Sequence, residues 1–383
     1  MKTVVAFVGT RPEAIKMAPV VRTLAATKGL RTILVSTGQH REMLEQALGL
    51  FGLVPDHSLD VMRPDQTLAG LTSRMIAAID PLLAELAPDF CLVQGDTTST
   101  FVAGLASFYR RIPFGHIEAG LRTGDLLAPF PEEGNRRLVT AVAQLHFAPT
   151  EGSRENLRRE GVPEETIEVT GNTVVDALFL EMERQRRPEV DAKLKETLAA
   201  ELGPGWWQQP IVLITGHRRE NFGHGFDEIC RAIAKLSGEF PDHSFIYPVH
   251  LNPNVQEPVR RLLGGRGNVR LIRPQDYSAF VALMRASRLI VTDSGGVQEE
   301  APSLGKPVLV MRDKTERPEG IAAGTVRLVG AHCDPIVAGV RELLTSETAY
   351  RRMAEAKNPY GDGRASERIR DTCLRVLAGM GSS

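Results

Sequence analysis

Short apolar segments alternate with segments of helical pattern along most of the chain. In the first half they read TVVAFVG, TILVSTG, FCLVQGD, PFGHIEAG and QLHFAP, and in the second half PIVLITGH, SFIYPVH, VRLIRP, LIVTDSG and PVLVMR. Strands that are apolar on both faces and alternate with helices are typical of parallel sheets covered by helices. The pattern therefore predicts an α/β fold with a parallel sheet in each half of the chain.

A polar stretch, RQRRPEVDAKLKETLAAELGPGWWQQP, separates the two groups and looks like a connector. A chain of 383 residues is also too long for a single core of ordinary size. The predicted N-terminal domain spans residues 1–172 and is rejoined by a C-terminal helix over 364–380, and the predicted C-terminal domain spans 173–363. We expect two Rossmann-like domains that face each other across a deep cleft.

Charge and cysteine usage exclude several classes of protein. The formal net charge is -1, so no global positive field attracts nucleic acid or an anionic membrane. The cysteines, Cys91, Cys230, Cys333 and Cys373, lie far apart and form no C-x-x-C pair, which indicates buried free thiols in a reducing compartment. No window approaches the roughly eighteen apolar residues of a membrane helix. We expect a cytoplasmic protein with no nucleic-acid or membrane partner.

Polar residues with cationic side chains follow strands in both halves. In open α/β sheets, ligands bind beyond the carboxyl ends of the strands. Arg11 and Lys16 follow the first strand and could reach a phosphate at the N-terminus of the next helix. His217 ends a strand of the second half beside two arginines, which together would form a local anion site. The alternative for each is an ordinary charged surface.

Several acids also follow strands of the first half. Asp96 comes after a buried strand, Glu118 after the next, and Glu132 lies in a proline-bounded loop with Glu133. Carboxylates held near one another and away from water suit general acid–base chemistry. The alternatives are that Asp96 caps the following helix and that the other acids form surface ion pairs.

Three motifs are missing. No G-x-G-x-x-G follows the first strand, there is no G-x-x-x-x-G-K-[ST], and no histidine and carboxylate cluster has familiar metal spacing. We therefore expect neither a cofactor nor a metal ion. The residues alone predict a two-domain protein that binds a phosphorylated ligand and surrounds part of it with carboxylates.

The motifs taken together strongly resemble those of the non-hydrolysing UDP-N-acetylglucosamine 2-epimerases. They are GTRPEAIKMAPV, TGQHREML, QGDTTST, HIEAGLRTGD, PFPEEGNRR, VTGNTVVDAL, TGHRREN, RPQDYSAF and TDSGGVQEEAPSLGKPVLVMRDKTERPEG, in that order. The resemblance implies a glycosyltransferase-B-like fold, a homodimer, and reversible interconversion of UDP-N-acetylglucosamine and UDP-N-acetylmannosamine, a precursor of surface polysaccharides. It also implies elimination of UDP to give a 2-acetamidoglucal, followed by re-addition.

The resemblance also assigns roles to single residues. The implied catalytic residues are Asp96, Glu118, Glu132 and His217. The implied UDP-binding residues are Arg11, Lys16, Gln275, Phe280, Ser294, Gly295, Gly296, Glu300 and Arg317. A second UDP-N-acetylglucosamine would bind as an activator through Gln39, His40 and Arg41, although the next residue, Glu42, replaces a glutamine found in some members.

The segment VTDSGGVQEE shows how these roles fit one turn of chain. Ser294, Gly295 and Gly296 would offer a hydroxyl and backbone N–H groups to a UDP phosphate. Glu300 would accept hydrogen bonds from the ribose hydroxyls, as the acid does in dinucleotide sites. For Glu299 we expect only an acid in the first helical turn, favoured by the helix dipole.

Three other functions share part of this pattern. A hydrolysing 2-epimerase would release N-acetylmannosamine and UDP, and a glycosyltransferase of the same fold would need an acceptor site and usually one catalytic base. A sugar-nucleotide sensor would bind without turnover. The combination of Asp96, Glu118, Glu132 and His217 favours the epimerase, because a pure binder has no evident use for all four.

Overall fold

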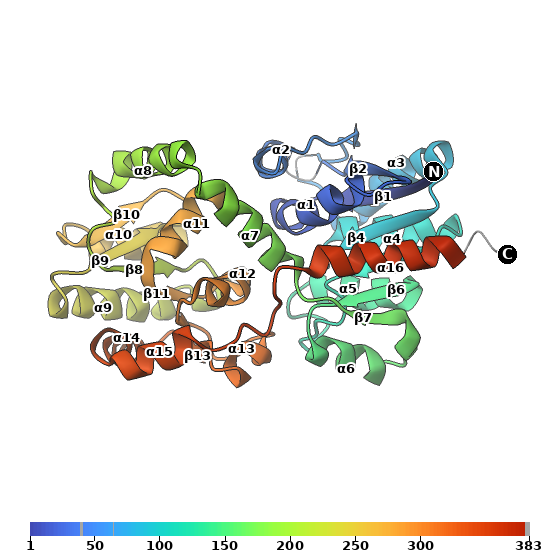
Figure 1. The fold of residues 1–383 in the computed structure, drawn as a ribbon. Coiled ribbons are helices and arrows are strands. Elements are labelled where there is room, and N and C mark those ends of the chain that lie inside the picture. The colour runs from blue at the N-terminus through green and yellow to red at the C-terminus, as the bar shows by residue number, and fades with distance from the viewer. Residues whose placement is uncertain (39–40, 64, 380–383) are drawn as a thin grey trace. The chain divides into compact units, whose positions relative to one another are not determined.

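The computed structural model describes residues 1–38, 41–63 and 65–379. The chain forms two compact α/β units (Figure 1). Unit 1 comprises Met1–Leu180 and the C-terminal segment that starts at Tyr360, and unit 2 comprises Glu181–Pro359. The chain thus enters unit 2 inside helix α7 (Thr173–Gln185), whereas the sequence placed the boundary just before this helix.

Unit 1 is built on a parallel sheet. Its strands are β1 (Lys2–Val8), β2 (Leu30–Ser36), β3 (His57–Ser58), β4 (Phe90–Gln94), β5 (Phe114–Ile117), β6 (Leu145–Ala148) and β7 (Ile167–Val169). They lie in the order β3-β2-β1-β4-β5-β6-β7. Its helices are α1 (Arg11–Ala25), α2 (Arg41–Leu50), α3 (Leu68–Leu86), α4 (Thr98–Tyr109), α5 (Glu132–Val142), α6 (Glu151–Arg159), the first part of α7, and α16 (Ala365–Gly379), with a 3-10 turn at Glu164–Thr166.

Burial on both faces explains why the strands of unit 1 are apolar throughout. Val5 of β1 lies opposite Ile33 and Cys91 in register, and all three side chains are buried. They pack with Met75 and Ile79 of α3. Each large apolar side chain buried in this way contributes about 1.5–3 kcal/mol. Helix α16 packs along α1, so the C-terminus completes the cover of unit 1 (Figure 1).

Unit 2 repeats the arrangement. Its strands are β8 (Ile211–Thr215), β9 (Ser244–Pro248), β10 (Val269–Ile272), β11 (Ser287–Thr292), β12 (Val308–Val310) and β13 (Val326–Leu328), in the order β10-β9-β8-β11-β12-β13. Its helices are α8 (Pro188–Leu202), α9 (His224–Glu239), α10 (Pro253–Leu263), α11 (Tyr277–Ala286), α12 (Gly295–Glu300), α13 (Pro318–Ala322), α14 (Cys333–Thr345) and α15 (Glu347–Ala354), with 3-10 turns at Arg219–Asn221 and Ala301–Leu304.

The polar stretch over residues 184–210 is not a linker. Helix α8 packs on α11 and β10 of unit 2, and Leu198 and Leu202 on its inner face are buried. Trp206, which follows it, is also buried and donates from Nε1 to the carbonyl of Lys195 at 3.3 Å. The expectation of a connector was therefore wrong. The stretch looked like a linker because most residues of α8 are polar, although the apolar residues on one face of this helix pack against unit 2.

Both sheets confirm the predicted fold of two Rossmann-like parallel sheets, and each has one switch point. In unit 1 the chain runs outward from β1 through β2 and β3 and returns to β4 on the other side of β1. In unit 2 the same reversal separates β8 from β11. Ligands of open α/β sheets bind beyond the carboxyl ends of the strands at such points. Each switch point is therefore a candidate ligand-binding position in its own unit.

The four cysteines are free thiols; Cys91, Cys230 and Cys373 are buried as expected, whereas Cys333 is only half-buried. Burial raises the pKa of Cys91, Cys230 and Cys373 to about 12, so these thiols stay protonated and unreactive at neutral pH. Among the described helices, none combines the length and the apolar character that crossing a bilayer requires.

Candidate functional site

Glu13 joins the two segments that flank the switch point of unit 1. Its Oε2 accepts hydrogen bonds from the N–H groups of Gly9 and Thr10, both at 2.7 Å, which completes the capping box of α1. Its Oε1 accepts from the hydroxyls of Thr97 and Thr100 beside β4. Burial raises the pKa of Glu13, and these hydrogen bonds oppose the rise. Glu13 was not among the predicted site residues, although the spacing of Thr10 and Glu13 is a capping-box signature.

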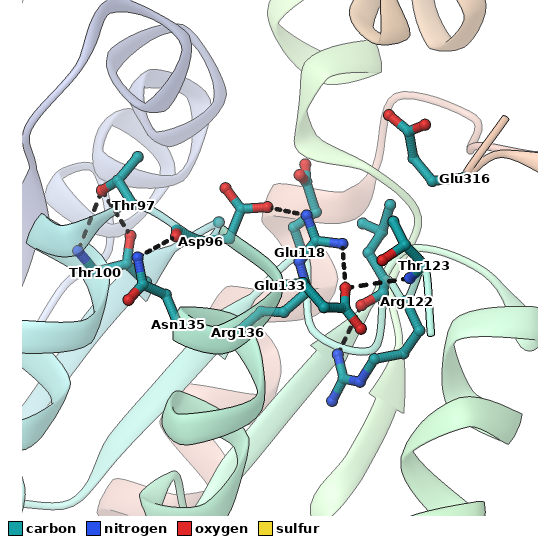
Figure 2. A network of polar contacts seen from close by, with 12 residues as sticks. Asp96, Thr97, Thr100, Glu118, Arg122, Thr123, Glu133, Asn135, Arg136 and Glu316 are labelled. Atoms are coloured by element: carbon teal, nitrogen blue, oxygen red, sulfur yellow. Dashed lines mark hydrogen bonds and ion pairs between the residues drawn. The ribbon is translucent and has the colours of Figure 1, made fainter. Parts of the chain in front are cut away.

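Asp96 lies at the carboxyl end of β4, held from both its backbone and its side chain. Arg136 donates from Nη2 to its Oδ2, and Asn135 donates to its carbonyl at 2.9 Å (Figure 2). The side chain remains 27% exposed. Thr97, and not Asp96, caps α4 by accepting from the backbone N–H of Thr100. The alternative that Asp96 is a helix cap is therefore excluded.

Glu133 orients the arginine that contacts Asp96. Its carboxylate is completely buried and accepts from Arg136 Nη1 at 3.1 Å and from Arg137 Nε at 3.2 Å. It also accepts from the backbone N–H groups of Thr123 and Gly124, so the loop before α5 is tied to the helix (Figure 2). Arg136 thus lies between two carboxylates, one buried and structural and the other partly open to solvent.

Glu118 follows β5 directly and has a left-handed backbone, with φ of 65°. Non-glycine residues in this region cost about 1–3 kcal/mol and are concentrated at functional sites. Its Oε2 accepts from Lys16 Nζ and, at 3.2 Å, from the amide of Asn172. The Glu118 side chain is only 9% exposed. The sequence predicts that Lys16 is a phosphate ligand. In the structure it contacts the carboxylate of Glu118.

The other predicted residues of unit 1 lie at the same edge of the sheet. Gln94 and Ile117 are register partners in β4 and β5, so Asp96 and Glu118 leave the sheet side by side. Arg11 is the first residue of α1, next to β1. Glu132 is the first residue of α5, and its side chain makes no hydrogen bond or ion pair within the described part of the chain.

In unit 2, Asp293 fixes His217 across the switch point. His217 follows β8 and Asp293 follows β11. Asp293 Oδ2 accepts from the backbone N–H groups of His217 and Arg218, both at 2.8 Å, and Nδ1 of His217 lies 3.1 Å from its Oδ1. Burial alone would raise the pKa of Asp293, but the contacts with His217 and the N–H groups hold it below its ordinary value. The charged carboxylate places the imidazole proton on Nδ1. The ring is 44% exposed, so Nε2 can accept from or donate to a ligand.

Arg317 is the centre of a buried ion cluster. Its Nε donates to Glu299 Oε1 at 2.7 Å, and Nη1 contacts Glu316. Burial opposes ionisation of Glu316, but the charges of Arg317 and Arg312 lower its pKa to about 2. A Cβ at Gly295 would lie 2.5 Å from Arg317 Nη1, so this glycine makes room for the guanidinium. Glu299 is 1% exposed and holds Arg317, so the expectation of a helix-dipole role alone was wrong.

Seven of the nine residues predicted for UDP lie on several elements of unit 2, apart from Arg11 and Lys16 of α1: Gln275 before α11, Phe280 on α11, Ser294 before α12, Gly295, Gly296 and Glu300 on α12, and Arg317 before α13. Glu300 is buried, and its Oε1 accepts from the hydroxyl of Tyr277 at 2.7 Å. Gln275 donates to the carbonyl of Arg273 at 2.7 Å. The hydroxyl of Tyr277 therefore orients the Glu300 carboxylate.

The model of the UDP-N-acetylglucosamine 2-epimerase family matches residues 22–374 of the chain. The chain belongs to this family. It is 56% identical over 370 residues to the UDP-N-acetylglucosamine 2-epimerase of Yersinia pestis, covering 96% of this chain and 97% of that one. The enzyme of Escherichia coli K12 is 54% identical over 369 residues, covering 96% and 97%. The match confirms the UDP-N-acetylglucosamine 2-epimerase family, and with it UDP-N-acetylglucosamine 2-epimerase activity.

Solved structures of the family have the same fold. The UDP-GlcNAc 2-epimerase of Neisseria meningitidis bound to UDP-GlcNAc has a TM-score of 0.90 at 48% identity, covering 98% of this chain and all of that chain. That of Methanocaldococcus jannaschii in complex with UDP-GlcNAc and UDP has a TM-score of 0.79 at 31% identity, covering 99% of both. The glycosyltransferase-B-like class of this epimerase is thereby confirmed.

The predicted activator segment is only partly described. Gln39 and His40 lie outside the described residues, and Arg41 is the first residue of α2. Within residues 1–38, 41–63 and 65–379, no group of three or more His, Cys, Asp or Glu side chains could hold a metal ion.

Replacing His116 of β5 by glutamine is expected to make the epimerase less sensitive to acid. Burial lowers the pKa of His116 from 6.5 to about 3. Because the folded value lies below the unfolded one, the stability linked to the neutral imidazole is complete above pH 6.5 and is lost as the pH falls towards 3. In this window the wild type should lose about 1.4 kcal/mol more unfolding free energy per pH unit than H116Q. Hydrogen exchange of the β5 amides at pH 7 and at pH 5 measures the difference, and equal losses in both proteins would contradict it.

Proposed function

We propose that the protein interconverts UDP-N-acetylglucosamine and UDP-N-acetylmannosamine by eliminating UDP and adding it back after C2 has been reprotonated on the opposite face. The observation that carries this proposal is the pair of carboxylates at the edge of the unit 1 sheet. Arg136 contacts Asp96 and Lys16 contacts Glu118. The two acids follow the carboxyl ends of β4 and β5, which are adjacent in the sheet. Related structures that contain bound UDP-GlcNAc and UDP support this class of ligand.

The reaction requires proton transfer at C2 and charge stabilisation at the phosphate. A base removes the C2 proton, the C–H electron pair forms the C1–C2 double bond, and UDP leaves with the electron pair of the C1–O bond. In the second half, a phosphate oxygen of UDP attacks C1 while an acid delivers a proton to the other face of C2. Because both faces of C2 are involved, the site needs more than one acid–base group.

Asp96, Glu118 and Glu132 supply these groups in our proposal. All three follow or lie near the carboxyl ends of β4 and β5, and Glu132 makes no bond within the described part of the chain that would compete with a substrate. Strain at Glu118 fits a side chain held for function, since its φ is 65°. A fixed array of this kind contributes to catalysis by orientation as well as by proton transfer.

The phosphate and nucleoside ends of UDP belong to other residues in this proposal. His217, with Nδ1 directed at Asp293, donates as an imidazolium from Nε2–H to a phosphate oxygen in this proposal and so stabilises the charge on the leaving UDP. Backbone N–H groups at Ser294–Gly296, together with Arg11, Lys16 and Arg317, favour the same charge. Glu300, fixed by Tyr277, accepts from the ribose hydroxyls, and Gln275 and Phe280 complete the nucleoside site.

A homodimer in the cytoplasm and activation by a second UDP-N-acetylglucosamine belong to the same proposal, and neither cofactor nor metal takes part in it. Sedimentation velocity tests the dimer. The dependence of the initial rate on UDP-N-acetylglucosamine concentration tests the activation, because an activating second molecule makes that dependence sigmoidal.

Turnover of UDP-N-acetylglucosamine in D2O, followed by proton NMR, tests the proposed reaction. We expect both epimers to acquire deuterium at C2 and to be recovered as UDP-sugars, because the C2 proton exchanges with solvent before UDP adds back. Release of free N-acetylmannosamine and UDP would instead identify a hydrolysing 2-epimerase. Turnover only with an added acceptor would identify a glycosyltransferase, and binding without turnover a sensor.

A further inference from the structure

His116 is a buried histidine next to the two acids of unit 1. It lies on β5, where Ile117 separates it from Glu118, and it is completely buried. Its Nε2 is 2.7 Å from the carbonyl oxygen of Gly95, the residue before Asp96. The N–H of Gly95 donates to the carbonyl of Ile117 at 3.0 Å. Both backbone groups of Gly95 are thus held by β5.

The hydrogen bond from His116 has a defined direction. A carbonyl oxygen only accepts, so the proton of the imidazole is on Nε2. Burial lowers the pKa of His116 to about 3, so the ring is neutral at physiological pH. Nδ1 is buried and makes no hydrogen bond within the described part of the chain. Within the described part of the chain, the His116 side chain therefore makes its hydrogen bond to Gly95 and to no other group.

Gly95 is a point where the chain can change direction. Its φ is 79°, in the left-handed region where glycine has no Cβ penalty. An unrestrained glycine here would let the Gly95–Asp96 peptide rotate, and Asp96 would then move relative to Glu118. The carbonyl that His116 holds is part of this peptide.

We propose that His116 is a positioning residue for epimerisation, which fixes Asp96 relative to Glu118 through the carbonyl of Gly95. The inference rests on the proposed function, since it takes these two acids as the proton-transfer groups. Proton transfer depends steeply on the distance between the carboxylate and the reacting carbon. A displacement of about 1 Å can cost on the order of 100-fold in rate.

The neighbouring strand provides a matched control. His146 of β6 is the register partner of His116 and is also buried. Its Nε2 lies 3.1 Å from a backbone carbonyl, that of Thr140 near the end of α5. Burial lowers its pKa as well. Unlike His116, it also has a contact at Nδ1, with the hydroxyl of Thr166 at 3.5 Å. Thr140 carries no proposed catalytic group.

The test compares H116L, H116Q and H146L by kcat, KM, UDP affinity from calorimetry, and melting temperature. We expect H116L to lose about 100-fold in kcat with KM and UDP affinity nearly unchanged. H116Q should recover most of the loss, because the glutamine amide can place a donor where Nε2 lies. H146L should lose thermal stability comparably and keep the wild-type kcat. If H116L does not fold, H116N replaces it, since its shorter amide cannot reach the position of Nε2.

Three results would overturn the proposal. They are a wild-type kcat in H116L or its substitute H116N, equal losses of kcat in the variants at positions 116 and 146, and a kcat of H116Q as low as that of H116L. A wild-type protein that fails to exchange the C2 proton would instead contradict the proposed function. The two failures are therefore distinguishable in the same set of assays.

Discussion

Asp96→Asn is expected to lower kcat about a hundred- to ten-thousand-fold while UDP affinity stays near the wild-type value, because general acid–base groups contribute this much to rate. Asparagine has nearly the same shape but does not exchange a proton at neutral pH. Arg136, which contacts Asp96, remains paired with the buried Glu133, so the substitution leaves no isolated buried cation. The rate of deuterium incorporation at C2 and the dissociation constant of UDP are the two measurements.

Asp80→Asn is the matched control for this variant. Asp80 of α3 pairs with Arg110 at 2.6 Å, and its side chain is 43% exposed. The same substitution there should leave kcat unchanged, because Asp80 is not one of the proposed site residues. It should also change stability little, because exposed ion pairs contribute little to the free energy of unfolding. Normal exchange in D96N would rule out Asp96 as a proton-transfer group, and loss of UDP affinity would make it part of the scaffold.

Arg317→Met is expected to destabilise unit 2 by about 3–5 kcal/mol, because it leaves a buried carboxylate without its cation. Glu299, which would lose its partner, is 1% exposed, and the Arg317 side chain itself is 11% exposed. Urea unfolding followed by tryptophan fluorescence measures the effect. The two tryptophans of the chain, Trp206 and Trp207, both lie in unit 2, so the signal reports on this unit.

Arg327→Met provides the comparison. Arg327 pairs with Glu342 at 2.6 Å, but the two side chains are 40% and 43% exposed, so the loss should stay below about 1 kcal/mol. The double variant R317M/E299Q should recover part of the loss, because it removes the isolated charge. Equal destabilisation by R317M and R327M would show that burial of the Arg317 cluster adds nothing to stability.

The strands that the sequence predicts are those with an uninterrupted apolar run between turn residues. β1, β4, β8 and β11 are central and buried on both faces, and each is preceded or followed by a recognisable turn. β3, β7 and β13 escaped prediction because they are two or three residues long and lie at sheet edges. Such strands are defined by pairing with a neighbour that is already in place, and this is a tertiary property.

Local pattern also explains why some of the proposed site residues could be placed in the sheet from the sequence. Asp96, Glu118 and His217 each follow a strand end, so their place in the sheet was visible in the sequence. Their partners were not, because contacts such as Asn172 with Glu118 join segments far apart in the chain. Glu299 shows the same limit, since only the folded loop brings Arg317 to its carboxylate.

Migration of an oxygen label tests the account most directly, because elimination requires the bond between C1 and the phosphate oxygen to break. UDP-N-acetylglucosamine carrying oxygen-18 between C1 and the β-phosphorus is incubated with the protein and followed by phosphorus NMR. Free UDP can rotate its terminal phosphate before it adds back, so the account predicts that label moves into the non-bridging positions as the epimers interconvert. Epimerised product that keeps all of its label in the bridge would contradict elimination and re-addition.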